Sequence, residues 1–311
     1  MEFKRKDLLG LEDLDKKEIE LILDTAKPMK DLFTRTVKKT PALRGKTVVN
    51  LFYEPSTRTR VSFELAAKRL SADTVNISAS GSSVVKGESL TDTAKTIESL
   101  GADIVIMRHP HSGAPHLISK HISCSVINAG DGTHEHPTQG LLDLFTIKEK
   151  KGSISGLRVG IVGDILHSRV ARSNIWGLKK LGAEVYVIAP ATLIPMEIED
   201  LGVKVSYKLA ETIKKLDVIN ILRIQKERQQ DQLFPSLGEY SAVFGVNTDI
   251  LNLAKKDLLI MHPGPMNRGV EVSSTVADSP NSVINEQVTN GIAVRMAVLY
   301  LLSGGENETN T

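Results

Sequence analysis

The segment VVNLFYEPSTRTRVSFELAAKRL, residues 48–70, contains a complete strand-to-helix turn. Its first six residues are mostly apolar, as in a buried strand, and Pro55 precedes a serine suited to cap a helix. Beyond the turn, apolar residues recur at the i, i+3, i+4 and i+7 spacing of an amphipathic helix, namely Phe63, Ala66, Ala67 and Leu70. The segment therefore predicts one strand and one helix joined by a short polar turn.

The turn itself, Ser56-Thr57-Arg58-Thr59-Arg60, predicts a phosphate site. A helix N-terminus offers free N–H groups and a partial positive charge, and here three hydroxyls and two guanidiniums accompany them within five residues. The same turn is also consistent with an ordinary capped helix whose arginines face water. The five residues alone do not decide between these two interpretations.

The rest of the chain repeats this alternation of strands and helices, which predicts parallel sheets and an α/β fold. We expect strands at residues 47–53, 73–79, 103–107, 125–129, 158–162, 184–189, 203–206, 217–222, 242–246 and 258–261. We expect helices at residues 11–26 and 137–150, helices ending near residues 100, 121 and 181, and a last helix at 282–302. A length of 311 residues suits two domains of about 150 residues each, and the charged segment at 148–152 is typical of a domain junction.

The unusual polar residues fall in loops after the strands, where open parallel sheets bind their ligands. Besides His136 and Gln139, these loops contain a set of cationic residues: Arg58, Arg60, Lys86, Arg108, Arg169, Arg223, Arg228 and Arg268. Guanidiniums bind phosphate and carboxylate groups in a bidentate manner, and each such charged hydrogen bond contributes about 1.5–3 kcal/mol. The pattern predicts a cleft between two domains that binds one or two substrates with several negative charges. Any one of these residues alone is also consistent with a surface ion pair, so the prediction rests on their number.

Composition and charge exclude several classes of protein. The net charge is +2 with a pI of about 8.5, and basic residues are scattered among acidic ones, so we expect no nucleic-acid partner. With 24% charged and 41% hydrophobic residues, and no hydrophobic signal segment near residue 1, we expect a soluble cytoplasmic protein without a membrane span. The single cysteine, Cys124, lies in an apolar run and is expected to be a buried structural thiol rather than a reactive one.

Common catalytic groups and cofactor motifs are absent from these loops. No loop has the Ser-His-Asp or Cys-His order of covalent catalysis. His134-Glu135-His136 lacks further ligands at a metal-binding spacing, so we expect no metal. Gly160 and Gly163 begin like a dinucleotide-binding turn, but no third glycine follows at the required spacing. We therefore expect no cofactor.

Three of these segments together resemble the carbamoyltransferase family: Ser56-Thr57-Arg58-Thr59-Arg60, His136-Pro137-Thr138-Gln139 and the loop ending in Lys86-Gly87-Glu88. The similarity covers essentially the whole chain, and it implies two doubly wound parallel-sheet domains with the active site in the cleft between them. Residues 1–135 would bind carbamoyl phosphate and would be completed by the final helix at 282–303. Residues 136–281 would bind the acceptor, and residues 304–311 would be a disordered tail.

Two further segments, residues 223–228 and 262–269, resemble those of the family members that act on aspartate. Ornithine-specific members would show a cysteine in a His-Cys-Leu-Pro loop and a Ser-Met-Gly segment, and this sequence has neither. The resemblance thus implies transfer of the carbamoyl group from carbamoyl phosphate to the α-amino group of L-aspartate in pyrimidine synthesis. A carbamoyltransferase for another amino compound and a non-catalytic anion-binding subunit remain as alternatives.

The resemblance also implies roles for individual residues. The phosphate would be bound by Ser56, Thr57, Arg58, Thr59 and Arg108. The carbamoyl group would be contacted by His136, Thr59, Arg108 and Gln139, and the backbone of Gly264 and Pro265 would meet the carbamoyl and amino groups. Aspartate would be bound by Lys86, Arg169, Arg223 and Gln225. The catalytic set would be Arg58, Thr59, Lys86, Arg108 and His136, which would orient the substrates and stabilise developing charge without a protein nucleophile.

Assembly and domain closure follow from the same resemblance. The chain would form a homotrimer in which Ser82 and Lys86 reach the active site of a neighbouring subunit. Glu54 would pair with Arg169 and Arg228 when the two domains close. The sequence leaves open whether such trimers associate with regulatory chains or with dihydroorotase.

Overall fold

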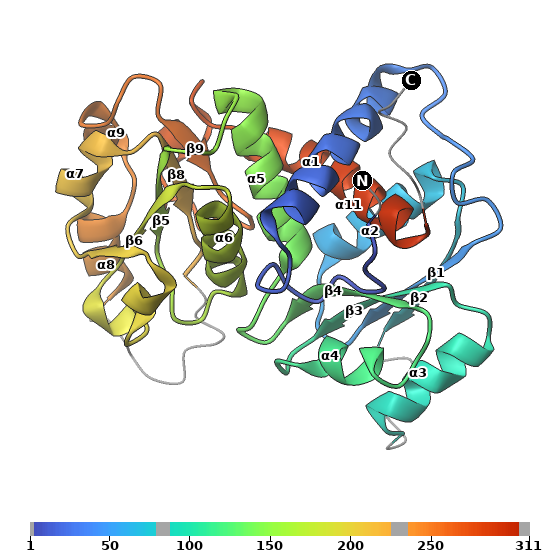
Figure 1. Ribbon diagram of the computed structural model, residues 1–311. Helices are drawn as coiled ribbons and strands as arrows, with labels where there is room; N and C mark the ends of the chain where they lie inside the picture. The colour runs from blue at the N-terminus through green and yellow to red at the C-terminus, as the bar shows by residue number, and fades with distance from the viewer. Residues whose placement is uncertain (1–2, 79–87, 225–235, 305–311) are drawn as a thin grey trace. The chain divides into compact units, whose positions relative to one another are not determined.

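The computed structural model describes residues 3–78, 88–224 and 236–304 (Figure 1). These residues form two compact units. Unit 1 consists of Met1–Leu142 together with Thr289–Thr311, and unit 2 consists of Asp143–Val288. The boundaries lie inside α5 (Pro137–Lys151) and α11 (Ile284–Leu302), whereas the resemblance implies boundaries just before these two helices.

Strands and helices alternate along both units, which confirms the predicted α/β fold. The elements before α5 are α1 (Lys16–Asp31), η1 (Leu32–Thr34), β1 (Thr47–Phe52), α2 (Thr57–Arg69), β2 (Asp73–Ser78), α3 (Leu90–Ser99), β3 (Ile104–His109), α4 (Ala114–Ser119) and β4 (Ser125–Asp131). Between α5 and α11 the chain forms β5 (Arg158–Val162), α6 (Arg169–Lys180), β6 (Glu184–Ile188), η4 (Ala191–Leu193), η5 (Ile198–Leu201), β7 (Lys204–Ser206), α7 (Leu209–Thr212), η6 (Ile213–Lys215), β8 (Val218–Ile221), α8 (Leu237–Phe244), α9 (Thr248–Asn252), β9 (Leu259–Met261) and α10 (Ser274–Ala277).

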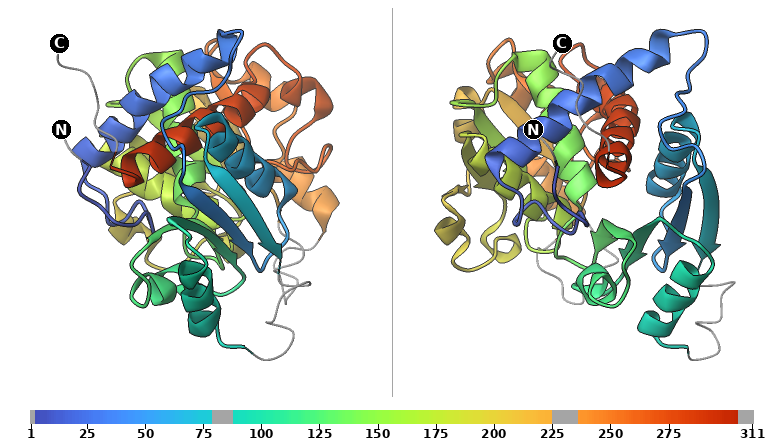
Figure 2. Two further views of the ribbon diagram at one scale, coloured as in Figure 1. Left: turned by 90° about the vertical axis from the view of Figure 1, so that its right-hand side faces the viewer. Right: turned by 45° about the vertical axis from the view of Figure 1, so that its right-hand side comes forward.

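Within the described residues, unit 1 contains a four-stranded parallel sheet, sheet A, in the order β2-β1-β3-β4. Successive side chains of a strand point to opposite faces of the sheet, and α3 and α4 lie on one of these faces (Figures 1 and 2). The core on that face is formed by Val49, Leu51, Val105, Met107 and Val126 from the strands and by Ala94, Ile97, Ala114 and Ile118 from the helices.

α2 lies on the opposite face of sheet A and also binds α11 (Figure 2). Phe63 of α2 is fully buried, and the guanidinium carbon of Arg295 in α11 lies 5.0 Å from the centre of its ring. Nη1 of Arg295 also donates a hydrogen bond of 2.9 Å to Oγ of Ser62. These contacts join the end of the described chain to its first third and complete unit 1.

Unit 2 contains a five-stranded parallel sheet, sheet B, whose described strands have the order β7-β6-β5-β8-β9. Its interior contains a buried carboxylate, Asp143 of α5. Oδ2 of Asp143 accepts hydrogen bonds from the amides of Asn174 in α6 (2.8 Å) and Asn220 in β8 (3.1 Å), and Oδ1 accepts one from Gln287 in α11 (2.8 Å). Because a buried charge needs such partners, this network fixes three helices and a strand relative to one another.

The predicted strand at residues 242–246 is wrong, because the chain forms α8 there. Ser236 caps this helix by accepting a hydrogen bond from the N–H of Glu239, and the buried rings of Tyr240 and Phe244 stack with their centres 5.7 Å apart. An apolar run of five residues is too short for periodicity to separate a strand from a helix. The Ser-x-x-Glu pattern at 236–239 is the signal that favours the helix.

The first helix differs from the predicted helix at 11–26 at both ends. α1 begins at Lys16 because Asp15 and Glu18 form a reciprocal capping box. It continues through Pro28 to Asp31. Pro28 is exposed, so water can hydrate the carbonyl group that loses its helical N–H partner at this position.

Candidate active site

Unit 1 brings the carboxyl ends of three strands to one edge of sheet A. The parallel register aligns Phe52 of β1 with Arg108 of β3, and His109 of β3 with Asp131 of β4. The predicted phosphate and carbamoyl residues lie at or just beyond these strand ends: Ser56, Thr57, Arg58, Thr59, Arg108, His136 and Gln139. The structure therefore gathers them within one unit, as their positions after strands predict.

The N-terminus of α2 differs from an ordinary capped helix. Ser56 occupies the N-cap position with φ −160° and ψ 95°, but its side chain accepts no hydrogen bond from the first turn. Thr57 and Arg58 are exposed at this end, whereas Thr59 is buried. The side chain of Ser56 therefore takes up none of the first-turn N–H groups. At a helix N-terminus these groups point outward, where they can bind an anion.

Arg108 is held in a defined orientation beside this helix end. Its Nη2 lies 2.6 Å from Oε1 of Glu54, and its Nη1 donates a hydrogen bond of 3.1 Å to the carbonyl oxygen of Ala129. Only 11% of the Arg108 side chain is exposed. A buried guanidinium fixed by two partners loses little conformational freedom when it binds a further acceptor.

His136 and Gln139 lie at the start of α5 and are both buried. The carbonyl oxygen of His136 accepts hydrogen bonds from the N–H groups of Gln139 (2.9 Å) and Gly140 (3.1 Å), as an N-cap residue does. Pro137 follows as the first residue of the helix, a position that proline favours because its missing N–H is not needed there. These bonds fix the backbone of His136 at the helix N-terminus.

Glu135 joins the loop before His136 to the N-terminal segment of the chain. Its buried carboxylate accepts hydrogen bonds from the N–H groups of Leu11 (2.8 Å) and Glu12 (3.0 Å). Leu8 forms a parallel bridge with Ile127 of β4, so the segment before α1 runs along the edge of sheet A. The N-terminal segment is therefore part of the support of this loop.

Unit 2 repeats the arrangement at the carboxyl edge of sheet B. β5, β8 and β9 are neighbours, and they are followed by Arg169, Arg223 and the Gly264–Pro265 pair. Arg169 is the first residue of α6 and is buried, and Arg223 is partly exposed. The predicted aspartate residues that the structure describes thus follow adjacent strands.

The loop after β9 is fixed by a buried histidine. Nδ1 of His262 accepts a hydrogen bond of 2.8 Å from the N–H of Gly264, and its Nε2 lies 3.3 Å from Oε1 of Glu271. The peptide bond between Gly264 and Pro265 is cis. Arg268 of the same loop forms two hydrogen bonds of 2.8 Å with Asp278 at the surface, so for this arginine the surface ion pair is the correct interpretation.

Charge at the helix ends agrees with an anion site. The first turns of α2, α5 and α6, which carry or adjoin these residues, contain no acidic side chain. In contrast, α1, α3 and α8 have Glu18, Asp92 and Glu239 in their first turns. An acidic residue at this position stabilises a helix but repels a bound anion. These three helix ends therefore carry no acidic side chain that would oppose an anion, a feature that the short helices α4 and α10 share.

Several predicted residues cannot be placed in this description. Lys86 and Ser82, and likewise Gln225 and Arg228, lie outside the described residues, as does nearly all of the predicted tail at 304–311. Cys124 is half-buried rather than fully buried. Burial, with a smaller effect from Glu98, raises the pKa of its thiol to about 11, so the thiolate is scarce at neutral pH.

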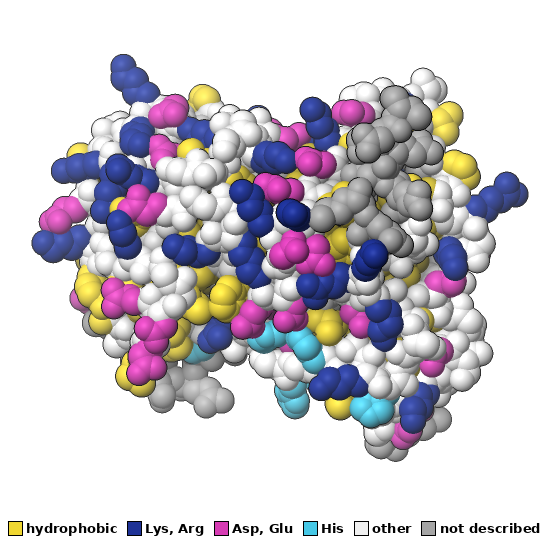
Figure 3. Space-filling view, in the orientation of Figure 1, with side chains coloured by type: hydrophobic (Ala, Val, Ile, Leu, Met, Phe, Trp, Pro, Cys, Tyr) yellow, Lys and Arg dark blue, Asp and Glu magenta, His cyan; other side chains and the backbone are white. Residues whose placement is uncertain are grey.

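On the face drawn in Figure 3, basic and acidic side chains are interspersed rather than gathered by sign. Among the described helices, none combines the length and apolar character that a membrane crossing requires.

Comparison with known families gives two matches, one in each half of the chain. Residues 6–149 match the model described as "Aspartate/ornithine carbamoyltransferase, carbamoyl-P binding domain", and residues 155–302 match "Aspartate/ornithine carbamoyltransferase, Asp/Orn binding domain". The chain belongs to the aspartate/ornithine carbamoyltransferase family. The resemblance inferred from the motifs is confirmed.

Individual members of the carbamoyltransferase family are similar over nearly the whole chain. An aspartate carbamoyltransferase catalytic subunit from Endomicrobium trichonymphae is 66% identical over 302 residues, 97% of each chain. Aspartate transcarbamoylase from Trypanosoma cruzi, in complex with carbamoyl aspartate and phosphate, is 32% identical with a TM-score of 0.87 and 96% coverage of each chain. Ornithine carbamoyltransferase from Pyrococcus furiosus is 35% identical with a TM-score of 0.85, covering 97% of this chain and 98% of its own. The fold is therefore shared by enzymes for both acceptors.

Sequence reasoning missed the buried carboxylates that hold the loops of this carbamoyltransferase. Asp131, Asp164 and Glu271 are fully buried, and Glu135 is nearly so. Although burial raises the pKa of Asp131, hydrogen bonds from His134, the N–H of Gly113 and Asn128 together lower it below its usual value. The Gly-Asp-Gly pattern at 130–132 was the available signal, because an aspartate between glycines is typical of a structured turn.

We expect Gly10→Ala to destabilise this carbamoyltransferase chain. An added Cβ would lie 2.4 Å from Oε1 of Glu135, and that carboxylate is held by two backbone N–H groups. The expected loss is about 1–3 kcal/mol in the free energy of unfolding, measured by urea denaturation. Gly238→Ala in α8 is the control, because the nearest neighbour of an added Cβ would be Oγ of Ser236 at 3.8 Å and alanine favours helices. Equal stability of Gly10→Ala and the wild type would contradict the support role of Glu135.

Proposed function

We propose that this chain transfers the carbamoyl group of carbamoyl phosphate to the α-amino group of L-aspartate, giving N-carbamoyl-L-aspartate and phosphate. The main support is its 66% identity, over nearly the whole chain, to an aspartate carbamoyltransferase catalytic subunit. The uncapped N-terminus of α2 and the cationic residues at the edge of sheet A suit a phosphorylated substrate. The similarity in fold to an ornithine enzyme does not oppose this, because the fold is common to both acceptors.

In the proposed reaction the substrates supply all the bonds that form and break. The amine of aspartate attacks the carbamoyl carbon, a C–N bond forms, and the C–O bond to phosphate breaks with its electron pair leaving on phosphate. The attacking nitrogen loses a proton, which the departing phosphate can accept. Because the enzyme needs no nucleophile of its own, its task is to orient two anions and to stabilise the charge on the carbamoyl oxygen.

Unit 1 would perform the carbamoyl phosphate part of this task. The phosphate would lie at the N-terminus of α2, bound by Ser56, Thr57, Arg58 and Thr59. Arg108 and His136 would donate hydrogen bonds to the carbamoyl oxygen, and Gln139 would contact the carbamoyl nitrogen. The orientation of Arg108, which Glu54 and the carbonyl oxygen of Ala129 fix, supports its role, since preorganised donors stabilise a developing charge without further rearrangement.

Unit 2 would bind aspartate through Arg169 and Arg223. Lys86 and Gln225 would contribute as well, and the backbone at Gly264 and Pro265 would meet the carbamoyl and amino groups. The hydrogen bond from Gly264 to His262 supports a fixed backbone at this loop. A dicarboxylate acceptor requires cations, whereas ornithine, with its additional ammonium group, would be repelled by them.

Phosphate release with separate acceptors tests the reaction. We expect the purified chain to release phosphate from carbamoyl phosphate with L-aspartate but not with ornithine, and the product to be N-carbamoyl-L-aspartate by mass spectrometry. Arg223→Ala should raise the KM for aspartate roughly 10- to 100-fold, because it removes charged hydrogen bonds of about 1.5–3 kcal/mol. Arg268→Ala is the matched control, since Arg268 pairs with Asp278 at the surface. Turnover with ornithine alone would overturn the acceptor assignment.

We also propose that the working unit is a homotrimer in which Ser82 and Lys86 complete the site of a neighbouring subunit. Lys86→Ala and Arg58→Ala chains should each be inactive alone. When they are coexpressed in equal amounts, roughly a quarter of the sites would lack both substitutions, so roughly a quarter of wild-type turnover should return. Self-mixed samples of each variant are the controls. Mixed trimers without activity would count against shared sites.

Glu54 has two candidate roles that kinetics can separate. We propose that it assists domain closure through Arg169 and Arg228, while in unit 1 its carboxylate pairs with Arg108. If closure is its main role, Glu54→Ala should lower kcat more than it weakens carbamoyl phosphate binding, measured by steady-state kinetics and calorimetry. An equal loss in both quantities would instead assign Glu54 to the orientation of Arg108.

The cellular setting of the enzyme follows from the proposed reaction. N-carbamoyl-L-aspartate belongs to pyrimidine synthesis, and we propose that the chain works in the cytoplasm. Regulatory chains or dihydroorotase are candidate partners of the trimer. Size measurement of the complex purified from its natural source, followed by identification of its components, would detect either partner.

A further inference from the structure

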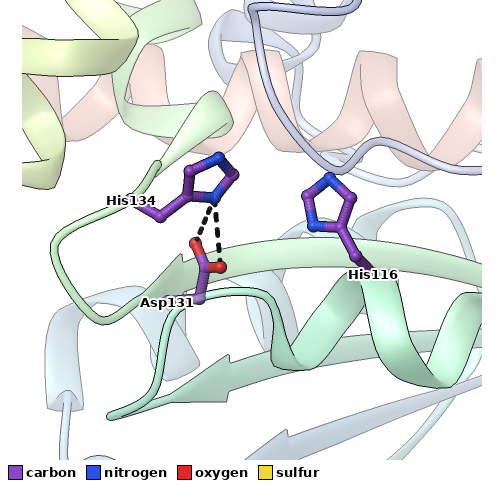
Figure 4. Close-up of side chains that lie close together, drawn as sticks. All are labelled: His116, Asp131 and His134. Atoms are coloured by element: carbon purple, nitrogen blue, oxygen red, sulfur yellow. Dashed lines mark hydrogen bonds and ion pairs between the residues drawn. The ribbon is translucent and has the colours of Figure 1, made fainter.

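Three side chains with metal-binding atoms meet in unit 1 beside the loop between β4 and α5. His116 comes from α4, Asp131 is the last residue of β4, and His134 lies in the loop itself. One ligand atom of each residue lies within 4.8 Å of the ligand atoms of the other two. Figure 4 shows the two imidazole rings side by side, with the carboxylate of Asp131 next to His134.

The geometry of the rings suits a shared ligand. The ring centres of His116 and His134 are 5.3 Å apart and the rings are inclined by 69°, so they do not stack face to face. Zinc binds imidazole nitrogen and carboxylate oxygen at about 2.0–2.2 Å, which separates the ligand atoms of a tetrahedral site by about 3.3 Å. Side-chain rotations that bring the ligand atoms closer to one another by about 1.5 Å or less would therefore close the cluster around one ion. Both histidines are partly exposed, and such rotations need no change in the core.

His116 supplies an independent indication of a missing ligand. Its Nδ1 is buried and finds no hydrogen-bond partner among the described residues. Buried polar atoms in folded proteins nearly always have a partner, and an orphaned one requires an explanation such as an ion. A metal ion at the cluster would satisfy this nitrogen.

The other two ligands are already held in place. Asp131 is fully buried, and its carboxylate accepts hydrogen bonds from the N–H of Gly113 (2.7 Å) and from Nδ2 of Asn128 (2.8 Å). Nδ1 of His134 lies 3.1 Å from Oδ2 of Asp131. A metal ion would replace the proton that these two groups share, and the remaining hydrogen bonds would continue to orient the carboxylate, as the outer partners of metal ligands do.

We propose that His116, Asp131 and His134 bind one Zn²⁺ ion. Two imidazoles and a carboxylate form a borderline N₂O ligand set that zinc accepts, with solvent in the open position. The ion would tie α4 to the loop that leads to His136. Its role is structural support of that loop, and it is separate from the carbamoyl transfer itself. The sequence pattern at residues 134–136 did not reveal this site. His116 and Asp131 come close to His134 only when the chain folds.

A second group of nearby atoms is the competing site. Glu12, His134 and Glu135 also have ligand atoms within 4.8 Å of one another. Both carboxylate oxygens of Glu135, however, accept hydrogen bonds from backbone N–H groups, and a metal there would have to compete with them. The oxygens of Asp131 likewise accept hydrogen bonds from backbone N–H groups, those of Gly113 and Glu135, so what favours the first site is the buried Nδ1 of His116 that finds no partner among the described residues. The two sites share only His134.

Titration calorimetry with Zn²⁺ alone tests the proposal. The chain is first stripped of metal with a chelator and then titrated, and its thermal unfolding is recorded with and without Zn²⁺. We expect one tight site per chain and a higher unfolding temperature with the ion, because a ligand that binds the folded state stabilises it. His116→Gln should weaken binding at least about 100-fold and abolish the rise in unfolding temperature, since even partners outside the ligand shell contribute about 10- to 100-fold.

Control variants test whether the loss of zinc binding is specific to the proposed ligands. His121→Gln removes an exposed histidine just beyond α4 whose Nδ1 lies 2.8 Å from the carbonyl oxygen of Leu117, and it should bind Zn²⁺ as the wild type does. Unchanged circular dichroism of metal-free His116→Gln would show that the variant is folded, and His134→Gln provides a second variant if it is not. The proposal is overturned if the wild type binds no zinc at one equivalent, if His116→Gln binds like the wild type, or if Glu12→Gln rather than His116→Gln removes the site.

Discussion

Parallel backbone pairing is the constraint that positions the candidate residues within each of the two units. In sheet A the register of β1, β3 and β4 fixes where each strand ends, so the N-terminus of α2, the guanidinium of Arg108 and the loop before His136 share an edge. These positions are set by main-chain hydrogen bonds and not by the side chains that would bind the ligand. In sheet B, the parallel register of β5, β8 and β9 fixes the strand ends in the same way. Where main-chain pairing sets the positions of a site, its side chains can be substituted without changing the backbone that holds them.

Acidic residues are abundant near these strand ends, but backbone N–H donors balance the charge of the buried carboxylates locally. Asp131, Glu135 and Glu271 each accept hydrogen bonds from backbone N–H groups in their own loop or in a neighbouring segment. Their negative charge is therefore balanced locally by donors. The first turns of α2, α5 and α6 have no acidic side chain. Buried carboxylates thus hold the loops, while the first turns of these three helices carry no negative charge that would oppose a bound anion.

Much of the fold, and the placement at strand ends of the residues expected to bind phosphate, could be predicted from the sequence because both depend on local patterns. Strand-helix alternation and the Ser-Thr-Arg-Thr-Arg turn are short-range signals, and they identified the edge of sheet A. Predictions failed where tertiary contacts decide. The first part of the segment at 242–246 belongs to α8, which ends at Phe244, because Ser236 caps this helix and the rings of Tyr240 and Phe244 pack together. Arg268 has a surface partner that only the fold provides, and His116 approaches Asp131 from another element of the chain.

The return of α11 to α2 makes unit 1 discontinuous in the chain. Unit 2 is formed by one uninterrupted stretch, Asp143–Val288, which is inserted into unit 1. During synthesis the N-terminal residues of unit 1 leave the ribosome first, but the partner of Phe63 and Ser62, Arg295, is made only after unit 2. Domains that are continuous can fold as they emerge. Unit 1 therefore remains incomplete, with one side of α2 uncovered, until α11 has been made.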